Sequence, residues 1–237
     1  MRDRNSNNNQ PDRISDTDLF LLRMMAEQGQ ASAQYNLGIM YDSGSGVGRD
    51  YALAAAWFRK AAEQGHAKAQ YNLGVSYSKG YGVPKDEAEA VKWYLKSAEQ
   101  GYVNAQFNLA HDYAAGLGVA RNDAEAAKWF RRAAEQGDAE AQRDLAMMYV
   151  AGRGVPRDEA EAVKWLIKAA KQGDGRAQVA LSVMYYNGRG VPKDDDEAVK
   201  WFRKAAEQDE AGAAYIMGLV HEADQDAAKD TDWQSSP

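Results

Sequence analysis

A phrase of 36 residues recurs through most of the chain, and its fixed period constrains the fold more than any other feature. Tryptophan, tyrosine and leucine each return at this step. They are Trp57, Trp93, Trp129, Trp165 and Trp201; Tyr41, Tyr77, Tyr113, Tyr149 and Tyr185; and Leu37, Leu73, Leu109, Leu145 and Leu181. A constant period of this length is typical of solenoids, whose units cannot bury an apolar face alone and therefore stack on their neighbours. We predict five complete repeats, at residues 31–66, 67–102, 103–138, 139–174 and 175–210.

A half repeat lies on each side of these five. The stretch LFLLRMMAEQG at 19–29 matches AAWFRKAAEQG at 55–65, and AGAAYIMGLVHEA at 211–223 matches AKAQYNLGVSYSK at 67–79. We therefore predict one solenoid domain over 16–224, with an N-terminal half repeat at 16–30 and a capping half repeat at 211–224. Residues 1–15 and 225–237 are polar, so we expect both segments to be disordered. Trp233 lies outside the register and is not assigned to the core.

The first half of each repeat is predicted to be a helix. In AKAQYNLGVSYSK, the spacing of Ala69, Leu73 and Tyr77 places them on one apolar face. The residue after the repeated leucine is always small, which allows a neighbouring helix to approach closely. This position holds Gly38, Gly74, Ala110, Ala146 and Ser182.

The second half of each repeat is predicted to be a helix that follows a Gly-x-Gly turn. Asp86 is a favourable N-cap residue, and Glu89 completes a capping-box pattern. We expect Gly101 to end this helix in the left-handed conformation. The predicted buried stripe consists of Ala90, Trp93, Tyr94, Ser97 and Ala98.

Composition narrows the class of protein. The chain of 237 residues has no cysteine, which removes disulfides, thiolate metal sites and cysteine nucleophiles. Its net charge is −6 and its basic residues form no stripe, so we do not expect nucleic acid to be a partner. No apolar run is long enough to span a bilayer, and no signal peptide is evident. We expect a soluble protein that is cytoplasmic as given, or periplasmic or secreted if a leader has been removed.

Motifs that could carry chemistry have simpler interpretations. The Gly-x-Gly loops follow helices rather than strands, so helix-ending turns with positive φ explain them better than phosphate binding. His66, His111 and His221 occupy unrelated repeat positions, and no pair has the spacing of a zinc site. The acidic run at 194–197 begins a helix, where the helix dipole favours carboxylates. We therefore expect no metal and no cofactor.

The repeat unit A-x-A-Q-x-x-L-G-x-x-Y-x-x-G-x-G-V-P-x-D-x-x-x-A-x-x-W-x-x-K-A-A-E-Q-G closely resembles the Sel-one-like repeat (SLR), over residues 17–222. The resemblance implies an all-α, right-handed α/α solenoid related to tetratricopeptide repeats. It also implies a scaffold that binds other proteins rather than an enzyme, in bacterial roles such as envelope regulation, host interaction or toxin neutralisation.

The same resemblance implies that the first helices line a concave groove. The residues that align with groove positions are predicted to bind a partner protein: Tyr35, Asn36, Ile39, Lys68, Tyr71, Asn72, Val75, Asn104, Phe107, Asn108, His111, Arg143, Met147, Arg176 and Val179. Two interpretations of Asn36, Asn72 and Asn108 stay open. The asparagines either bond a neighbouring helix or form a ladder that bonds an extended peptide backbone.

The predicted function is a non-catalytic adaptor that binds a protein or an extended peptide in this groove. Arg143 and Arg176 suggest that the partner has an acidic group near the C-terminal half of the groove. The alternative from another class is a hydrolase for a small amide substrate. Ser76-x-x-Lys79 matches one motif of penicillin-recognising enzymes, and some secreted, cysteine-rich relatives have been linked to β-lactams, but the companion motifs and the cysteines are missing. We expect a monomer, with association through the solenoid ends as the alternative.

Overall fold

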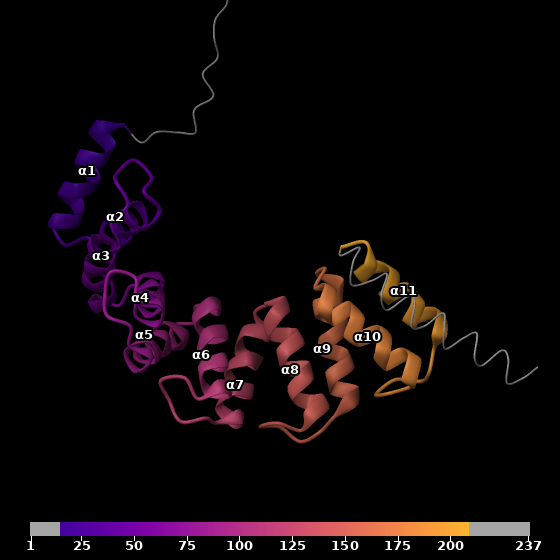
Figure 1. Ribbon diagram of the computed structural model, residues 1–237. Helices are drawn as coiled ribbons and strands as arrows, with labels where there is room; N and C mark the ends of the chain where they lie inside the picture. Colours follow the sequence, from indigo (N-terminus) through magenta and orange to yellow (C-terminus); the bar gives the residue numbers. More distant parts are fainter. Residues whose placement is uncertain (1–14, 209–237) are drawn as a thin grey trace, which may run out of the picture. The chain divides into compact units, whose positions relative to one another are not determined.

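The computed structural model describes residues 15–208, and in this part of the chain it consists of helices without strands (Figure 1). The helices are α1 (Asp16–Glu27), α2 (Ala31–Ser43), α3 (Tyr51–Glu63), α4 (Ala67–Lys79), α5 (Glu87–Glu99), α6 (Val103–Ala115), α7 (Asp123–Glu135), α8 (Ala139–Ala151), α9 (Glu159–Lys171), α10 (Gly175–Asn187) and α11 (Asp195–Ala206). Each complete repeat thus forms a pair of helices, as predicted. The half repeat at 16–30 contains α1, whereas the capping half repeat at 211–224 and both end segments lie outside the described residues, apart from Ser15.

The chain divides into two compact units at Asn122 and Asp123. The first unit contains α1 to α6 and the second contains α7 to α11. Within each unit, the main packing contacts join helices that follow one another in sequence. Within each unit, successive helices therefore stack on one another, which is the arrangement of a repeat fold. The single domain over 16–224 stays a prediction.

Small residues on the first helices allow this close stacking. An added Cβ on Gly74 would lie 2.6 Å from the ring of Tyr94, and one on Gly38 would lie 2.6 Å from the ring of Phe58. Each aromatic ring thus occupies the space that a side chain at the small position would need. The prediction that this position lets a neighbouring helix approach is confirmed in the first unit.

The repeated tryptophans are buried to different degrees. Trp129, Trp165 and Trp201 of the second unit are at most 7% exposed, whereas Trp57 and Trp93 of the first unit are half-buried. A cation from the next helical turn lies over each ring, 3.8 to 4.8 Å from its centroid. These cations are Lys60, Lys96, Arg132, Lys168 and Lys204. The predicted buried stripe is confirmed except at Trp93, where Lys96 covers a ring that the neighbouring helices leave partly open.

The capping box forms only in part. The Asp86 carboxylate accepts a hydrogen bond from the backbone N–H of Glu89 at 3.0 Å, as predicted. The backbone N–H of Asp86 donates instead to the Tyr77 carbonyl oxygen at 3.0 Å, so the predicted return bond from the Glu89 side chain is wrong. Glu89 pairs with Lys92, one turn further along α5. The carbonyl oxygen of Tyr77 thus accepts from the Asp86 N–H group. In an isolated helix, the Glu89 side chain would be the acceptor for this N–H group.

The Gly-x-Gly loops stack from one repeat to the next. Gly82 has a φ of 71°, and an added Cβ there would lie 2.0 Å from the backbone oxygen of Tyr51, at the start of the preceding α3. The residue between the glycines adds a side-chain contact at the same place. In the first unit the ring of Tyr81 stacks on that of Tyr51 at 5.0 Å between centroids. In the second unit Arg153 pairs with Asp123 at 3.0 Å. The prediction of turns with positive φ is confirmed. The close backbone contact is a further reason why the second position of the loop needs a residue without a Cβ atom.

Candidate protein-binding surface

The residues predicted to bind a partner lie on five first helices, α2, α4 and α6 in the first unit and α8 and α10 in the second. None of the fifteen is buried, and those with exposed side chains are Asn36, Lys68, Asn104, His111, Met147 and Arg176. We call these fifteen residues the first-helix face, and we describe its two parts unit by unit. Binding by the face stays a prediction.

Aromatic residues on the first helices of the first unit contact aromatic residues of the same repeat. The ring of Tyr71 lies 5.2 Å from that of Tyr102 and 5.8 Å from that of Tyr94, measured between centroids. The ring of Tyr35 stacks on the imidazole of His66 at 4.8 Å. Burial raises the pKa of Tyr71 above its ordinary value. These tyrosines therefore contribute to the packing inside their own repeats and present only part of each ring to solvent.

The asparagine ladder is uneven. Asn36 is exposed, whereas Asn72 and Asn108 are half-buried. The Asn108 amide interacts with the side chains of Tyr71 and Tyr94 and opposes the rise in their pKa that burial causes. Asn108 thus has a role between repeats, which agrees with one of the two interpretations of this position. Asn36 is exposed and remains suited to the other interpretation, in which the asparagines bond the backbone of an extended peptide.

Arg143 is the centre of an ion network in the second unit. Its guanidinium lies 2.9 Å from the carboxylate of Asp174, which precedes α10, and 2.9 Å from that of Asp144. The Arg143 side chain is only 14% exposed. Asp174 also accepts the backbone N–H of Ala177 at 2.7 Å and so caps α10. Arg143 thus joins two successive repeats, and Arg176 is the exposed cation of the predicted pair.

Large apolar side chains stand in solvent on the first helices of the second unit. Met147 on α8 is 47% exposed, and Val183 and Tyr186 on α10 are 45% and 40% exposed. Met147 was among the predicted binding residues, and Val183 occupies the same ninth position of its first helix, which the alignment also assigns to the groove. Tyr186 was missed, and its apolar ring at the twelfth, outward position is the signal that could have identified it.

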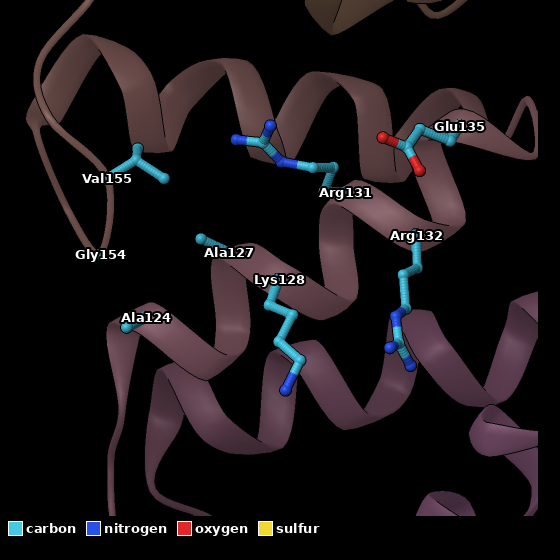
Figure 2. Close-up of a pocket in the computed structure, with 8 residues that line it drawn as sticks. All are labelled: Ala124, Ala127, Lys128, Arg131, Arg132, Glu135, Gly154 and Val155. Atoms are coloured by element: carbon cyan, nitrogen blue, oxygen red, sulfur yellow. The ribbon is translucent and has the colours of Figure 1, made fainter.

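A shallow hollow of about 370 Å³ lies on the second-helix side of the second unit (Figure 2). Its lining includes Lys128, Arg131 and Arg132 of α7, together with Glu135 and the loop residues Gly154 and Val155. Arg131 donates a hydrogen bond to the Tyr149 hydroxyl. The guanidinium of Arg132 lies 4.5 Å from the ring centroid of Trp129. Aromatic side chains therefore hold Arg131 and Arg132 in place. The sequence analysis did not identify this hollow, although the basic residues between Lys128 and Arg132 are a signal for it.

The five repeats match a known family of repeat proteins. The Sel1 repeat model matches residues 31–66, 67–102, 103–138, 139–174 and 175–210, which are the five repeats predicted from the period. The chain belongs to the Sel1 repeat family.

Solved structures with Sel1 repeats share the fold of this chain. A protective antigen of uropathogenic Escherichia coli with an SLR fold is 40% identical, with a TM-score of 0.83 over 88% of this chain. The match spans only 44% of that E. coli chain. A Sel1 repeat protein from Oxalobacter formigenes is also 40% identical, with a TM-score of 0.80 over 85% of this chain and 83% of that one. A Sel1 repeat protein from Klebsiella pneumoniae shares the fold at 22% identity, with a TM-score of 0.51 over 85% of this chain and 98% of its own. No curated protein matches the sequence.

The titratable groups of this Sel1 repeat chain form no cluster suited to metal binding among residues 15–208. Nor does any helix in that range have the length and apolar character needed to cross a bilayer. The Ser76 hydroxyl donates to the carbonyl oxygen of Asn72, one turn earlier in α4, at 3.0 Å. Ser76 is buried while Lys79 is exposed, so the two residues of the penicillin-enzyme motif differ in their access to solvent.

Proposed function

We propose that the chain is a non-catalytic scaffold that binds a protein or an extended peptide along the first-helix face. Sel1 repeat proteins are in general scaffolds, and the proposal gives this chain the same kind of role. In the first unit the face offers amides and partly exposed aromatic rings, a combination suited to peptide groups and to apolar side chains of a partner.

The observation that carries the proposal is the exposed apolar set Met147, Val183 and Tyr186. These residues lie on first helices of two successive repeats, where a monomeric protein gains nothing by exposing large apolar side chains. Arg143 on α8 pairs with Asp174, which caps α10, and so links the first helices of these two repeats. A partner would therefore meet a surface whose backbone is already fixed, which lowers the entropic cost of binding.

The partner expected for this surface has apolar side chains for Met147 and Val183, with an acidic group near Arg176. Arg143 supports the site by bridging repeats, since its charge is engaged by Asp144 and Asp174. In the first unit, Asn36 and Asn72 are the residues of the asparagine ladder that we expect to bond a partner's backbone.

A matched pair of substitutions tests the proposal. Val183 on α10 is 45% exposed and Val199 on α11 is 42% exposed, so the two valines differ in helix type but hardly in exposure. We would capture partners from a lysate of the source cell with the wild type, with Val183→Lys and with Val199→Lys, and then measure the affinity of each recovered protein by calorimetry.

We expect Val183→Lys to weaken binding at least tenfold and Val199→Lys to leave it unchanged. A partner that loses affinity only with Val199→Lys, or with charge reversal at Arg132, would place binding on the second-helix side and contradict the proposal. Combining Asn36→Ala with Asn72→Ala extends the test to the first unit, and Asn108 is left intact because Tyr71 and Tyr94 interact with it.

A further inference from the structure

The hollow beside α7 lies where this helix departs from the repeat pattern. Ala127 occupies a position that holds valine in three other repeats: Val91, Val163 and Val199. One turn further along, the position of Arg131 holds Leu95 on α5 and Ile167 on α9. On α7 a small residue and a long charged one thus replace two branched apolar side chains. Both Ala127 and Arg131 line the hollow of about 370 Å³.

Three cations line the same hollow, and no other complete repeat combines them with alanine at the position of Ala127. Lys128, Arg131 and Arg132 are at positions i, i+3 and i+4, which are neighbours on a helix surface. The second helix α11 has cations at the same three positions, but it has valine in place of Ala127. The second helix α3 has alanine at that position, but it lacks the first of the three cations. The combination is therefore specific to α7.

Aromatic side chains fix two of these cations without neutralising them. Arg131 donates a hydrogen bond to the hydroxyl of Tyr149, a residue that is only 8% exposed. Arg132 lies over the buried ring of Trp129. Among residues 15–208, no carboxylate lies within ion-pairing distance of either guanidinium group. A guanidinium group that is held in place and keeps free N–H donors is suited to carboxylate and phosphate oxygens, which it can bind through two parallel hydrogen bonds.

Figure 2 shows how these groups are arranged around the hollow. The Arg131 side chain extends from α7 toward Val155, whereas Lys128 and Arg132 extend together on the side away from Val155. Three further lining residues have no polar side chain: Ala124, Ala127 and Gly154. A ligand at this place would therefore meet one guanidinium group beside an apolar surface, with two more positive charges nearby.

Two carboxylates influence where an anion can bind. Glu125 pairs with Lys128 at 3.1 Å and so reduces the positive charge near the start of α7. Glu135 lines the hollow one helical turn beyond Arg131. We therefore expect the anionic group of a ligand at Arg131, and we expect the charge of Glu135 to weaken its binding by repulsion.

We propose that this hollow binds a small organic anion. The carboxylate or phosphate group of the anion pairs with the Arg131 guanidinium, and a short apolar part lies over Ala127 and against Val155. Lys128 and Arg132 add attraction through their charge. The volume is near the lower end of the range for small-molecule sites, about 300–1,000 Å³, so the ligand is compact. This site is separate from the first-helix face and does not depend on a partner there.

The backbone amides of Gly154 and Val155 report on binding, because both residues line the hollow. We would follow their chemical shifts by nuclear magnetic resonance while adding butyl phosphate, butyrate or butanol at constant ionic strength and neutral pH. Both anions should shift the two amides until the site is saturated, and the anion that binds more tightly identifies the preferred group. Butanol has the apolar part without the charge and should leave the amides unchanged. Inorganic phosphate should bind more weakly than butyl phosphate.

Three substitutions separate the effects of charge and shape. Arg131→Gln should raise the dissociation constant for butyl phosphate about tenfold, because the charge-assisted hydrogen bonds are lost. Ala127→Val should raise it by a similar factor with every charge retained, because the valine that three other second helices carry would occupy the hollow. Glu135→Gln should lower the dissociation constant, a gain in affinity that misfolding cannot produce.

Arg203→Gln is the matched control. Arg203 is exposed on α11 at the position of Arg131, and it has cations at the two neighbouring positions. The substitution changes the net charge by the same amount as Arg131→Gln, but valine stands at the position of Ala127 on α11. This variant should bind butyl phosphate as tightly as the wild type.

Three results would overturn the proposal. A lack of saturable shifts with both butyl phosphate and butyrate would show that the hollow binds no organic anion. An equal loss of affinity in Arg131→Gln and Arg203→Gln would indicate nonspecific attraction by net charge. Unchanged affinity in Ala127→Val, or equal affinities for inorganic phosphate and butyl phosphate, would show that no apolar part of a ligand enters the hollow.

Discussion

Asp112 is the residue whose chemistry differs most from its surroundings. Its side chain in α6 is 9% exposed, and the Oδ2 atom is buried without a hydrogen-bond partner. Burial, and to a lesser extent the charge of Glu87, raises the pKa of Asp112 to about 7. The same repeat position holds Met40, Ser76, Met148 and Met184 elsewhere, so no other repeat places an ionisable group there.

This carboxyl should make stability depend on pH. An unfolded aspartate ionises near pH 3.9, whereas the folded chain keeps its proton to about pH 7. Between these values the folded state binds more protons, so the free energy of unfolding should fall as the pH rises and level off above 7. One pKa unit corresponds to about 1.4 kcal/mol, and after solvent screening we expect a loss of about 2 kcal/mol.

Urea unfolding at pH 4.5 and pH 8 checks this expectation for the wild type and for Asp112→Met. The variant copies the methionine of other repeats and should be more stable at pH 8 by about 2 kcal/mol, with a smaller gain at pH 4.5. An equal gain at both values would show that packing, and not ionisation, sets the difference.

The loops are the elements that join one repeat to the next. In each unit the second glycine of a loop lies against the backbone that begins the preceding second helix, as Gly82 and Gly118 do in the first unit. The side chain between the glycines contacts the same place, through Tyr81 on Tyr51 or through Arg189 on Glu159. The Arg189 and Arg157 guanidinium groups lower the pKa of Glu159 to about 2. The loops therefore carry repeat-to-repeat contacts and do more than end a helix.

Substitutions at two glycines separate the contribution of this contact to stability from that of backbone strain. Gly82 and Gly101 both have positive φ, but an added Cβ on Gly101 meets nothing within 4 Å. Gly101→Ala should cost about 1 kcal/mol from the left-handed conformation alone. Gly82→Ala should cost about 1–3 kcal/mol more, because a backbone oxygen must move. Thermal or urea unfolding of both variants measures the difference, and equal losses would mean that the loop contact contributes nothing.

At the scale of the whole molecule, stability in a repeat protein comes from neighbouring units. In the first unit α1 packs mainly on α2, whereas α4 packs on both α3 and α5. Amide hydrogens of α1 should therefore exchange faster than those of α4 in dilute solution. Mass spectrometry of exchanged peptides checks this order. If α1 were as well protected as α4 at the lowest protein concentration, its exposed face would have to be covered within one chain.

The period of 36 residues was enough to predict the repeat boundaries, the two helices per repeat and the small position at Gly74, because all of these repeat in every unit. Features that differ between units could not be predicted in this way. The Arg143 network depends on Asp174, which lies at the end of the same repeat and caps α10, and the hollow depends on Tyr149 orienting Arg131. The half-formed capping box shows a third limit, since a bond from Asp86 to the more distant Tyr77 replaces a local one.

The graded burial of the tryptophans gives the protein an internal optical label for each unit. Indoles shielded from water emit at shorter wavelengths than those in contact with it, so Trp129, Trp165 and Trp201 should emit to the blue of Trp57 and Trp93. With Trp233 replaced by phenylalanine, the two wavelengths would report on the melting of the two halves separately, without any added dye.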